Sequence, residues 1–162
     1  MTENQSAIRA SQVIEPSIFQ SPTFQALTIG VPFCIFKLLF GVLSIRTGVE
    51  KSSFLVSFGW LVIAWASVDL AMNLARVLFH LSGRESPVEY CTIAQAGRFF
   101  GRPSLFLAID TFLSFSIICF VLWSGWIKDL GTAESYMWYA ATTLNLISIS
   151  LVNIWLELGR RS

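Results

Sequence analysis

Four long apolar stretches limit what this chain can fold into. They cover residues 24–45, 54–80, 104–127 and 136–156. Each holds about the 20 mostly apolar residues that an α-helix needs to cross the hydrocarbon core of a bilayer. They are too long and too uniformly apolar for the alternating strands of a membrane barrel, so helices remain. The sequence therefore predicts an all-α integral membrane protein, a four-helix bundle of two up-down hairpins.

The composition points to the same surroundings. Hydrophobic residues make up 54% of the 162 residues and charged residues 13%, whereas a typical soluble domain carries about 25% charged residues. With a net charge of +1, the chain offers no basic face to nucleic acid. These values exclude an ordinary soluble enzyme domain, a disordered chain and a nucleic-acid binder. We expect a cytoplasmic arm over 1–23, a four-helix membrane domain over 24–158 and a basic C-terminal end at 159–162.

Lysine and arginine residues near the ends of the spans predict the orientation, because they concentrate in cytoplasmic segments. Six lie on the side of the two termini and the middle loop, and three lie on the other side. The first set is Arg9, Arg84, Arg98, Arg102, Arg160 and Arg161, and the second is Arg46, Lys51 and Lys128. We therefore expect both termini in the cytoplasm.

The middle loop, residues 81–103, carries its own folding signals. Ser86 to Glu89 has the pattern of a capping box with proline at the first helical position, and Gly97 would end a helix of about ten residues. We expect this short helix to lie on the cytoplasmic membrane surface. Three Gly-Arg pairs in the loop contain Arg84, Arg98 and Arg102. These arginines either anchor the loop at anionic headgroups or form a docking surface for a soluble partner or an anionic ligand.

Ionisable and amide side chains inside the spans are costly in lipid and mark candidate functional residues. Lys37 shares a helix face with small residues, which indicates that it faces a neighbouring helix. A rise of 1.5 Å per residue gives the depth of each side chain along its helix. These depths match Arg76 best with Asp110, with Asp69 as a second and deeper partner, and they match Lys37 with Asp69 or Asn145. The predicted intramembrane network consists of Lys37, Asp69, Asn73, Arg76, Asp110 and Asn145. It would specify packing, contact a partner subunit or carry a proton or ion.

The chain has few of the residues from which catalytic and metal sites are usually built. The chain has a single histidine, His80, and three cysteines without a C-x-x-C pair, so neither a metal centre nor a dithiol enzyme is expected. We predict a protein that is not an enzyme. Asp69, Asn73 and Arg76 have residue types similar to the E-x-x-N-x-R pattern of chlorophyll-binding helices, at longer spacings. Asn73 and His80 are the candidate ligands if chlorophyll or another pigment binds.

The stretch GRFFGRPSLFLAIDTFLSF and its Trp- and Phe-rich flanks resemble small four-helix membrane proteins of photosynthetic bacteria. The resemblance implies a thylakoid or plasma membrane location and service to a photosynthetic complex. Our first hypothesis is a non-enzymatic accessory subunit or assembly factor of a larger membrane complex. The alternatives are a small oligomeric transporter or channel subunit that uses the intramembrane Asp and Lys residues, and a pigment-binding membrane protein.

Overall fold

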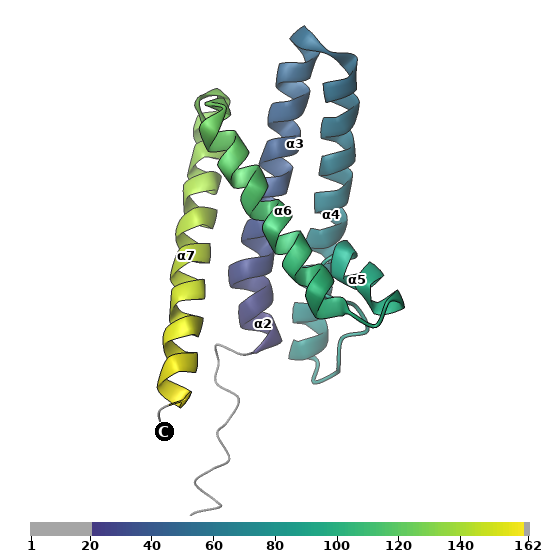
Figure 1. Ribbon diagram of the computed structural model, residues 1–162, viewed down its shortest axis with the longest axis vertical. Helices are drawn as coiled ribbons and strands as arrows, with labels where there is room; N and C mark the ends of the chain where they lie inside the picture. The colour runs from purple at the N-terminus through teal and green to yellow at the C-terminus, as the bar shows by residue number, and fades with distance from the viewer. Residues whose placement is uncertain (1–20, 161–162) are drawn as a thin grey trace, which may run out of the picture.

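The computed structural model describes residues 21–160, and every regular element in this part is helical (Figure 1). The first long helix is continuous but has three sections, α2, the π-helical η2 and α3. It is followed by α4, the short α5, α6, the 3-10 turn η3 and α7. The bounds are α2 Pro22–Gln25, η2 Ala26–Gly30, α3 Val31–Lys51, α4 Ser53–Leu81, α5 Thr92–Phe99, α6 Pro103–Trp123, η3 Trp126–Asp129 and α7 Thr132–Arg160.

Four of the described helices are long and apolar enough to cross a membrane, in agreement with the four predicted stretches. They are Pro22–Lys51, Ser53–Leu81, Pro103–Trp123 and Thr132–Trp155. The largest difference in bounds is at the first helix, which was predicted to end at residue 45 and continues to Lys51. The third helix was predicted to reach residue 127 and ends at Trp123. Gly125 there adopts a left-handed φ of 79°, which the backbone of a right-handed helix cannot continue through.

The α3 helix is the element around which the others are arranged. The chain rises through α2 and α3, returns through α4, crosses obliquely as α6 and returns as α7, so that the start of α2 and the end of α7 lie at the same end (Figure 1). Half of the most apolar window of the first long helix is buried, against 22%, 17% and 22% in the other three. Large side chains such as Phe112 and Leu146 are exposed on the outer faces.

Small residues allow α3 and α4 to approach closely. A Cβ atom on Gly59 would lie 2.6 Å from the carbonyl oxygen of Gly41, and one on Gly41 would lie 2.6 Å from Cγ1 of Ile63. Contacts this short do not occur between real side chains, so both positions require glycine at this helix separation. Close backbone approach at small residues is the usual way in which helices associate without a hydrophobic driving force.

At the end away from α5, side chains from α3, α6 and α7 form a common apolar cluster. Phe36 on α3 meets Trp138 on α7 edge to face, with ring centroids 4.9 Å apart. Beyond this cluster, the guanidinium of Arg46 donates two hydrogen bonds to the carboxylate of Glu134, at 2.7 and 2.6 Å. The cluster and the ion pair together hold α7 against α3.

The middle loop differs in detail from the prediction. The predicted capping box does not start a helix, because the Ser86 hydroxyl accepts from the N–H of Val88, two residues along, and closes a local turn. The helix begins instead at Thr92, with the Cys91 sulfur accepting from the N–H of Ala94. Gly97 does not end the helix, which continues to Phe99 and is followed by a left-handed φ of 65° at Gly101. A Cβ atom on Gly97 would lie 2.6 Å from that of Phe106 on α6, so the glycine allows a close contact between the two helices.

We predict that Gly59→Ala destabilises the protein by about 1–3 kcal/mol, because the added methyl group overlaps the Gly41 carbonyl and forces α3 and α4 apart. The free energy of unfolding in detergent micelles, measured by tryptophan fluorescence during titration with a denaturing detergent, checks this. Ala64→Val enlarges an exposed position of the same helix and serves as the control, with little change expected. Equal stability of Gly59→Ala and wild type would contradict the close-approach argument.

Candidate functional site

A buried lysine on α3 lies between two aspartates from two other helices. The Nζ atom of Lys37 donates to Oδ2 of Asp69 on α4 at 2.8 Å and to Oδ1 of Asp110 on α6 at 2.6 Å. Lys37 is 1% exposed, Asp69 0% and Asp110 4%. Charges are buried this deeply only when they are paired and hydrogen-bonded. We call these three residues the charged triad, and it connects three of the four long helices.

An indole ring supplies the third contact of the ammonium group. The Nζ atom of Lys37 lies 4.2 Å from the ring centroid of Trp65, within the range of a cation–π interaction. Trp65 lies four residues before Asp69, so both face α3 from one side of α4. The indole Nε1 of Trp65 donates in turn to the hydroxyl of Thr92 at 2.8 Å, which extends the network to α5.

The second oxygen of Asp69 holds the start of α5. Oδ1 accepts from the backbone N–H of Thr92 at 2.7 Å and from its hydroxyl at 2.9 Å. Thr92 is the first residue of α5, where backbone N–H groups have no partner within the helix and the helix dipole favours a negative charge. One carboxylate therefore joins the buried ammonium to the N-terminus of the short helix.

Asn73 continues the polar face of α4 by one turn. Its Nδ2 atom donates to the carbonyl oxygens of Asp69 and Tyr90, at 2.9 and 2.8 Å, and lies 3.8 Å from the sulfur of Cys34. Its Oδ1 atom has no hydrogen-bond partner within the described residues. A Cβ atom on Gly30 would overlap this oxygen, so glycine at position 30 is what allows Asn73 to be placed there.

The pairing that depth along the helices predicted for Arg76 is not the one observed. Its Nη1 atom donates to the carbonyl oxygen of Val88 at 2.6 Å, and the guanidinium lies 3.8 Å from the ring centroid of Tyr90. The loop before α5 folds back over α4 and offers these partners, while Lys37 takes the Asp110 carboxylate. Asn145 is also outside the triad, buried on α7, and its amide atoms make no hydrogen bond with the described part of the chain.

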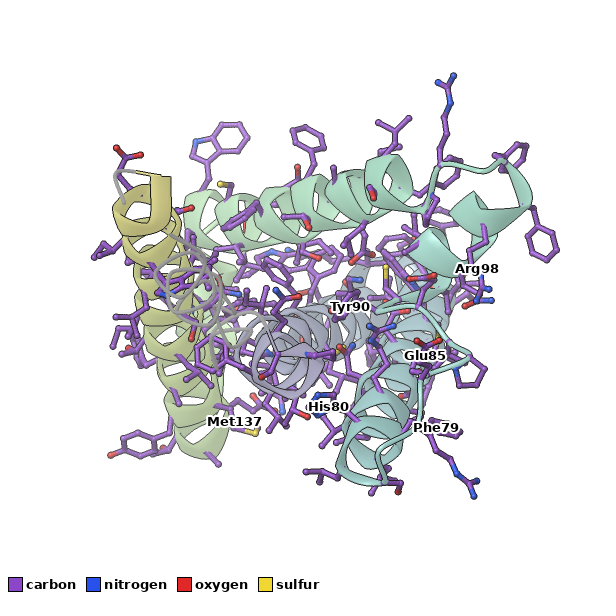
Figure 2. All side chains as sticks on the ribbon, turned by 90° about the horizontal axis from the view of Figure 1, so that it is seen from below. Phe79, His80, Glu85, Tyr90, Arg98 and Met137 are labelled. Atoms are coloured by element: carbon purple, nitrogen blue, oxygen red, sulfur yellow. The ribbon has the colours of Figure 1, made fainter. Side chains whose placement is uncertain are left out.

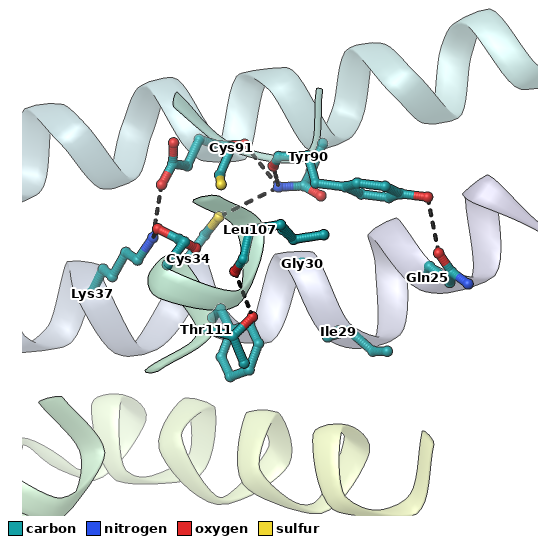
Figure 3. A pocket seen from close by; sticks show the side chains of 13 residues that line it. Gln25, Ile29, Gly30, Cys34, Lys37, Tyr90, Cys91, Leu107 and Thr111 are labelled. Carbon is teal, nitrogen blue, oxygen red and sulfur yellow. Dashed lines mark hydrogen bonds and ion pairs between the residues drawn. The ribbon is translucent and has the colours of Figure 1, made fainter. Parts of the chain in front are cut away.

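A cavity of about 130 Å³ lies beside the charged triad, between η2, α3, α4, the loop before α5 and α6. Lys37 lies towards one end of it and the hydrogen bond from the Tyr90 hydroxyl to Oε1 of Gln25, 2.9 Å long, towards the other (Figure 3). Cys91 also lines the cavity. Burial raises the pKa of the Cys91 thiol to about 12, so at neutral pH it is a protonated thiol beside the carboxylate of Asp110.

The three arginines of the middle loop lie at the end of the molecule that carries α5. Arg98 donates to the carbonyl oxygen of Pro87 at 2.8 Å, and its Nε atom lies 3.7 Å from Oε1 of Glu89. All three arginines are exposed. Figure 2 views this end, with Arg98 at the rim and Tyr90 nearer the centre. Between two of the arginines, Phe99 and Phe100 are 85% and 71% exposed, a feature that the sequence analysis did not single out.

The two candidate pigment ligands, Asn73 and His80, lie in different environments. Asn73 is 1% exposed and lies within the network just described. His80 is exposed near the end of α4, with its Nδ1 atom 2.9 Å from the hydroxyl of Thr23. Pigment binding by either residue stays a prediction. Among the described residues there is no group of three His, Cys, Asp or Glu side chains that could hold a metal ion.

Comparison with family models, with curated proteins and with solved structures finds no match to this chain. The resemblance to membrane proteins of photosynthetic bacteria therefore stays a prediction, and the function has to be argued from the charged triad and its surroundings.

We predict that Lys37→Met destabilises the protein by about 3–5 kcal/mol, because it leaves two buried carboxylates without their cation. The triple variant Lys37→Met, Asp69→Asn, Asp110→Asn removes all three charges and should recover most of this loss. Unfolding in detergent micelles gives the free energies. Lys51→Met removes an exposed lysine from the same helix and should leave stability unchanged. A triple variant no more stable than Lys37→Met would contradict the pairing.

Proposed function

We propose that this chain is a multi-pass membrane protein that serves as a non-enzymatic accessory subunit or assembly factor of a larger membrane complex. In this proposal it docks through the end that carries α5, and it resides in a bacterial plasma or thylakoid membrane. One observation carries the proposal: the Asp69 carboxylate that pairs with the buried Lys37 also caps the N-terminus of α5.

The energetic cost of this arrangement supports a role for α5 beyond packing. Burying three charged groups is weak evidence for stability, because apolar residues of similar volume often stabilise a protein as well or better. Here the charges place an eight-residue helix that lies outside the four long helices. Because Gly97 has no side chain, α5 also packs closely against Phe106 of α6. The position of α5 is therefore held from two sides, as a preorganised binding surface requires.

The side chains that α5 and its loops expose suit a protein partner. Arg98 and Arg102 flank Phe99 and Phe100, and the two phenylalanines project into the surroundings. Aromatic and arginine side chains are the types enriched at protein interfaces and at their energetic centres. The broad exposed apolar faces of α6 and α7 leave room for lipid or for the helices of a partner subunit.

We infer that the end of the molecule that carries α5 is cytoplasmic. Six Lys and Arg residues lie on the side of the two termini and the middle loop and three lie on the other side, and such residues concentrate in cytoplasmic segments. In a variant with its three cysteines replaced, Ser124→Cys should react with a membrane-impermeant maleimide in intact cells. Ser82→Cys should react only after permeabilisation. The reverse pattern would overturn the orientation, and labelling of both from outside would contradict the four crossings.

Co-migration tests the docking proposal. After mild solubilisation of native membranes, the wild-type chain should run with a large complex on native gels. Arg98→Glu combined with Arg102→Glu should shift it towards its free size, because both charges on the docking surface are reversed. Lys128→Glu reverses one exposed charge at the other end and should not. A wild-type chain that runs free throughout, or a double variant that still co-migrates fully, would contradict docking through α5.

A further inference from the structure

The cavity beside the charged triad has the properties of a ligand site. We propose that it binds a small organic cation, an amine with an apolar body of about the size of a benzene ring. This inference concerns the interior of the molecule and holds whether or not α5 docks to a partner.

The size and the walls of the cavity fit such a body. Its volume of about 130 Å³ is close to that of engineered cavities of about 150 Å³ that bind benzene. Ile29, Phe33 and Leu107 supply apolar wall. Burying a ring-sized apolar group against these side chains gives the ligand its hydrophobic contribution to binding.

Beside the charged triad, the ammonium, amide and hydroxyl donors of the cavity wall are already engaged. The Lys37 ammonium donates to both aspartates and faces Trp65. The Asn73 amide donates to two carbonyl oxygens, and the Thr111 hydroxyl donates to the carbonyl oxygen of Leu107. These donors are already engaged, so a ligand that brings hydrogen-bond acceptors gains little from them.

Two acceptors remain next to the cavity. The Oδ1 atom of Asn73, a residue 1% exposed that lines the cavity, has no partner among the described residues. The Asp110 carboxylate accepts from Lys37 through Oδ1 and also from the Cys91 thiol. Because each carboxylate oxygen can accept two hydrogen bonds, capacity for a further donor remains. An unsatisfied buried acceptor costs free energy that a donating ligand recovers. The site therefore favours a ligand that donates hydrogen bonds.

The charge of the site selects a cation. With Lys37 and both aspartates ionised, the triad carries a net charge of −1. Lys37 is the only Lys or Arg among the described residues that line the cavity; Arg76 lies against the ring of Tyr90, and the Cys34 and Cys91 thiols that line the cavity are buried. An ammonium group supplies both the missing charge and the hydrogen-bond donors, and charge-assisted hydrogen bonds are the stronger kind.

Binding of two probes of matched shape to the purified full-length protein in micelles tests the proposal. Benzylamine carries a positive charge at neutral pH and benzyl alcohol does not. We expect titration calorimetry to show benzylamine binding at least about tenfold more tightly than benzyl alcohol, which corresponds to 1.4 kcal/mol. Because both probes partition into micelles, Leu107→Trp, which fills the cavity, is the control and should abolish the saturable binding of both.

Asp110→Asn keeps the shape of the site and removes its charge. In this variant benzylamine should lose its advantage, while the affinity for benzyl alcohol changes little. The proposal is overturned if wild type binds the two probes equally, if neither binds saturably, or if Asp110→Asn keeps the preference for the amine. The comparison within wild type decides the question even if the variant does not fold.

Discussion

The contact of one ammonium group with two carboxylates, far from water, is the interaction on which the rest of this structure depends. Lys37, Asp69 and Asp110 come from three different long helices and are almost completely buried. An unpaired charge at such a site costs several kcal/mol, so the three helices have to sit at the rotation and height that bring these atoms together. Apolar packing alone fixes the rotation and height of a helix less strictly, because different leucine-rich faces pack about equally well.

The triad also explains why α3 is at the centre and why α5 is ordered. Lys37 on α3 reaches both neighbours, and the glycines at positions 41 and 59 let α4 come close enough for Asp69 to meet it. Through Asp69 the same network continues to the N-terminus of α5. Not every polar group of this network has a hydrogen-bond partner. Oδ1 of Asn73 has none among the described residues, and Asn73 lines the cavity. Docking and ligand binding are both proposed from this one network.

The sequence analysis was accurate where the physics is local along one helix. The four apolar stretches and the inward-facing side of α3 follow from hydropathy and the 3.6-residue period alone. It was less accurate for partners from elsewhere in the chain. Lys37 with Asp69 was one of the two pairings predicted for the lysine and is observed, but the contact of Lys37 with Asp110 was not predicted. Arg76 was paired with Asp110 from depth, yet the returning loop offers Arg76 the Val88 carbonyl. Trp65 and Thr92, which complete the network, carry no signal in the sequence beyond the four-residue spacing of Trp65 and Asp69.

The sequence by itself determined that the chain has four apolar helices and that its few charged residues inside them must find partners, because neither lipid nor an apolar core accepts an unpaired charge. Only the tertiary structure decided which partners these are. The rise per residue sets the height of a side chain along its own helix, but the rotation of each helix and the oblique crossing of α6 depend on the packing of all of them. This packing of the helices places one lysine between two aspartates and leaves the cavity beside them.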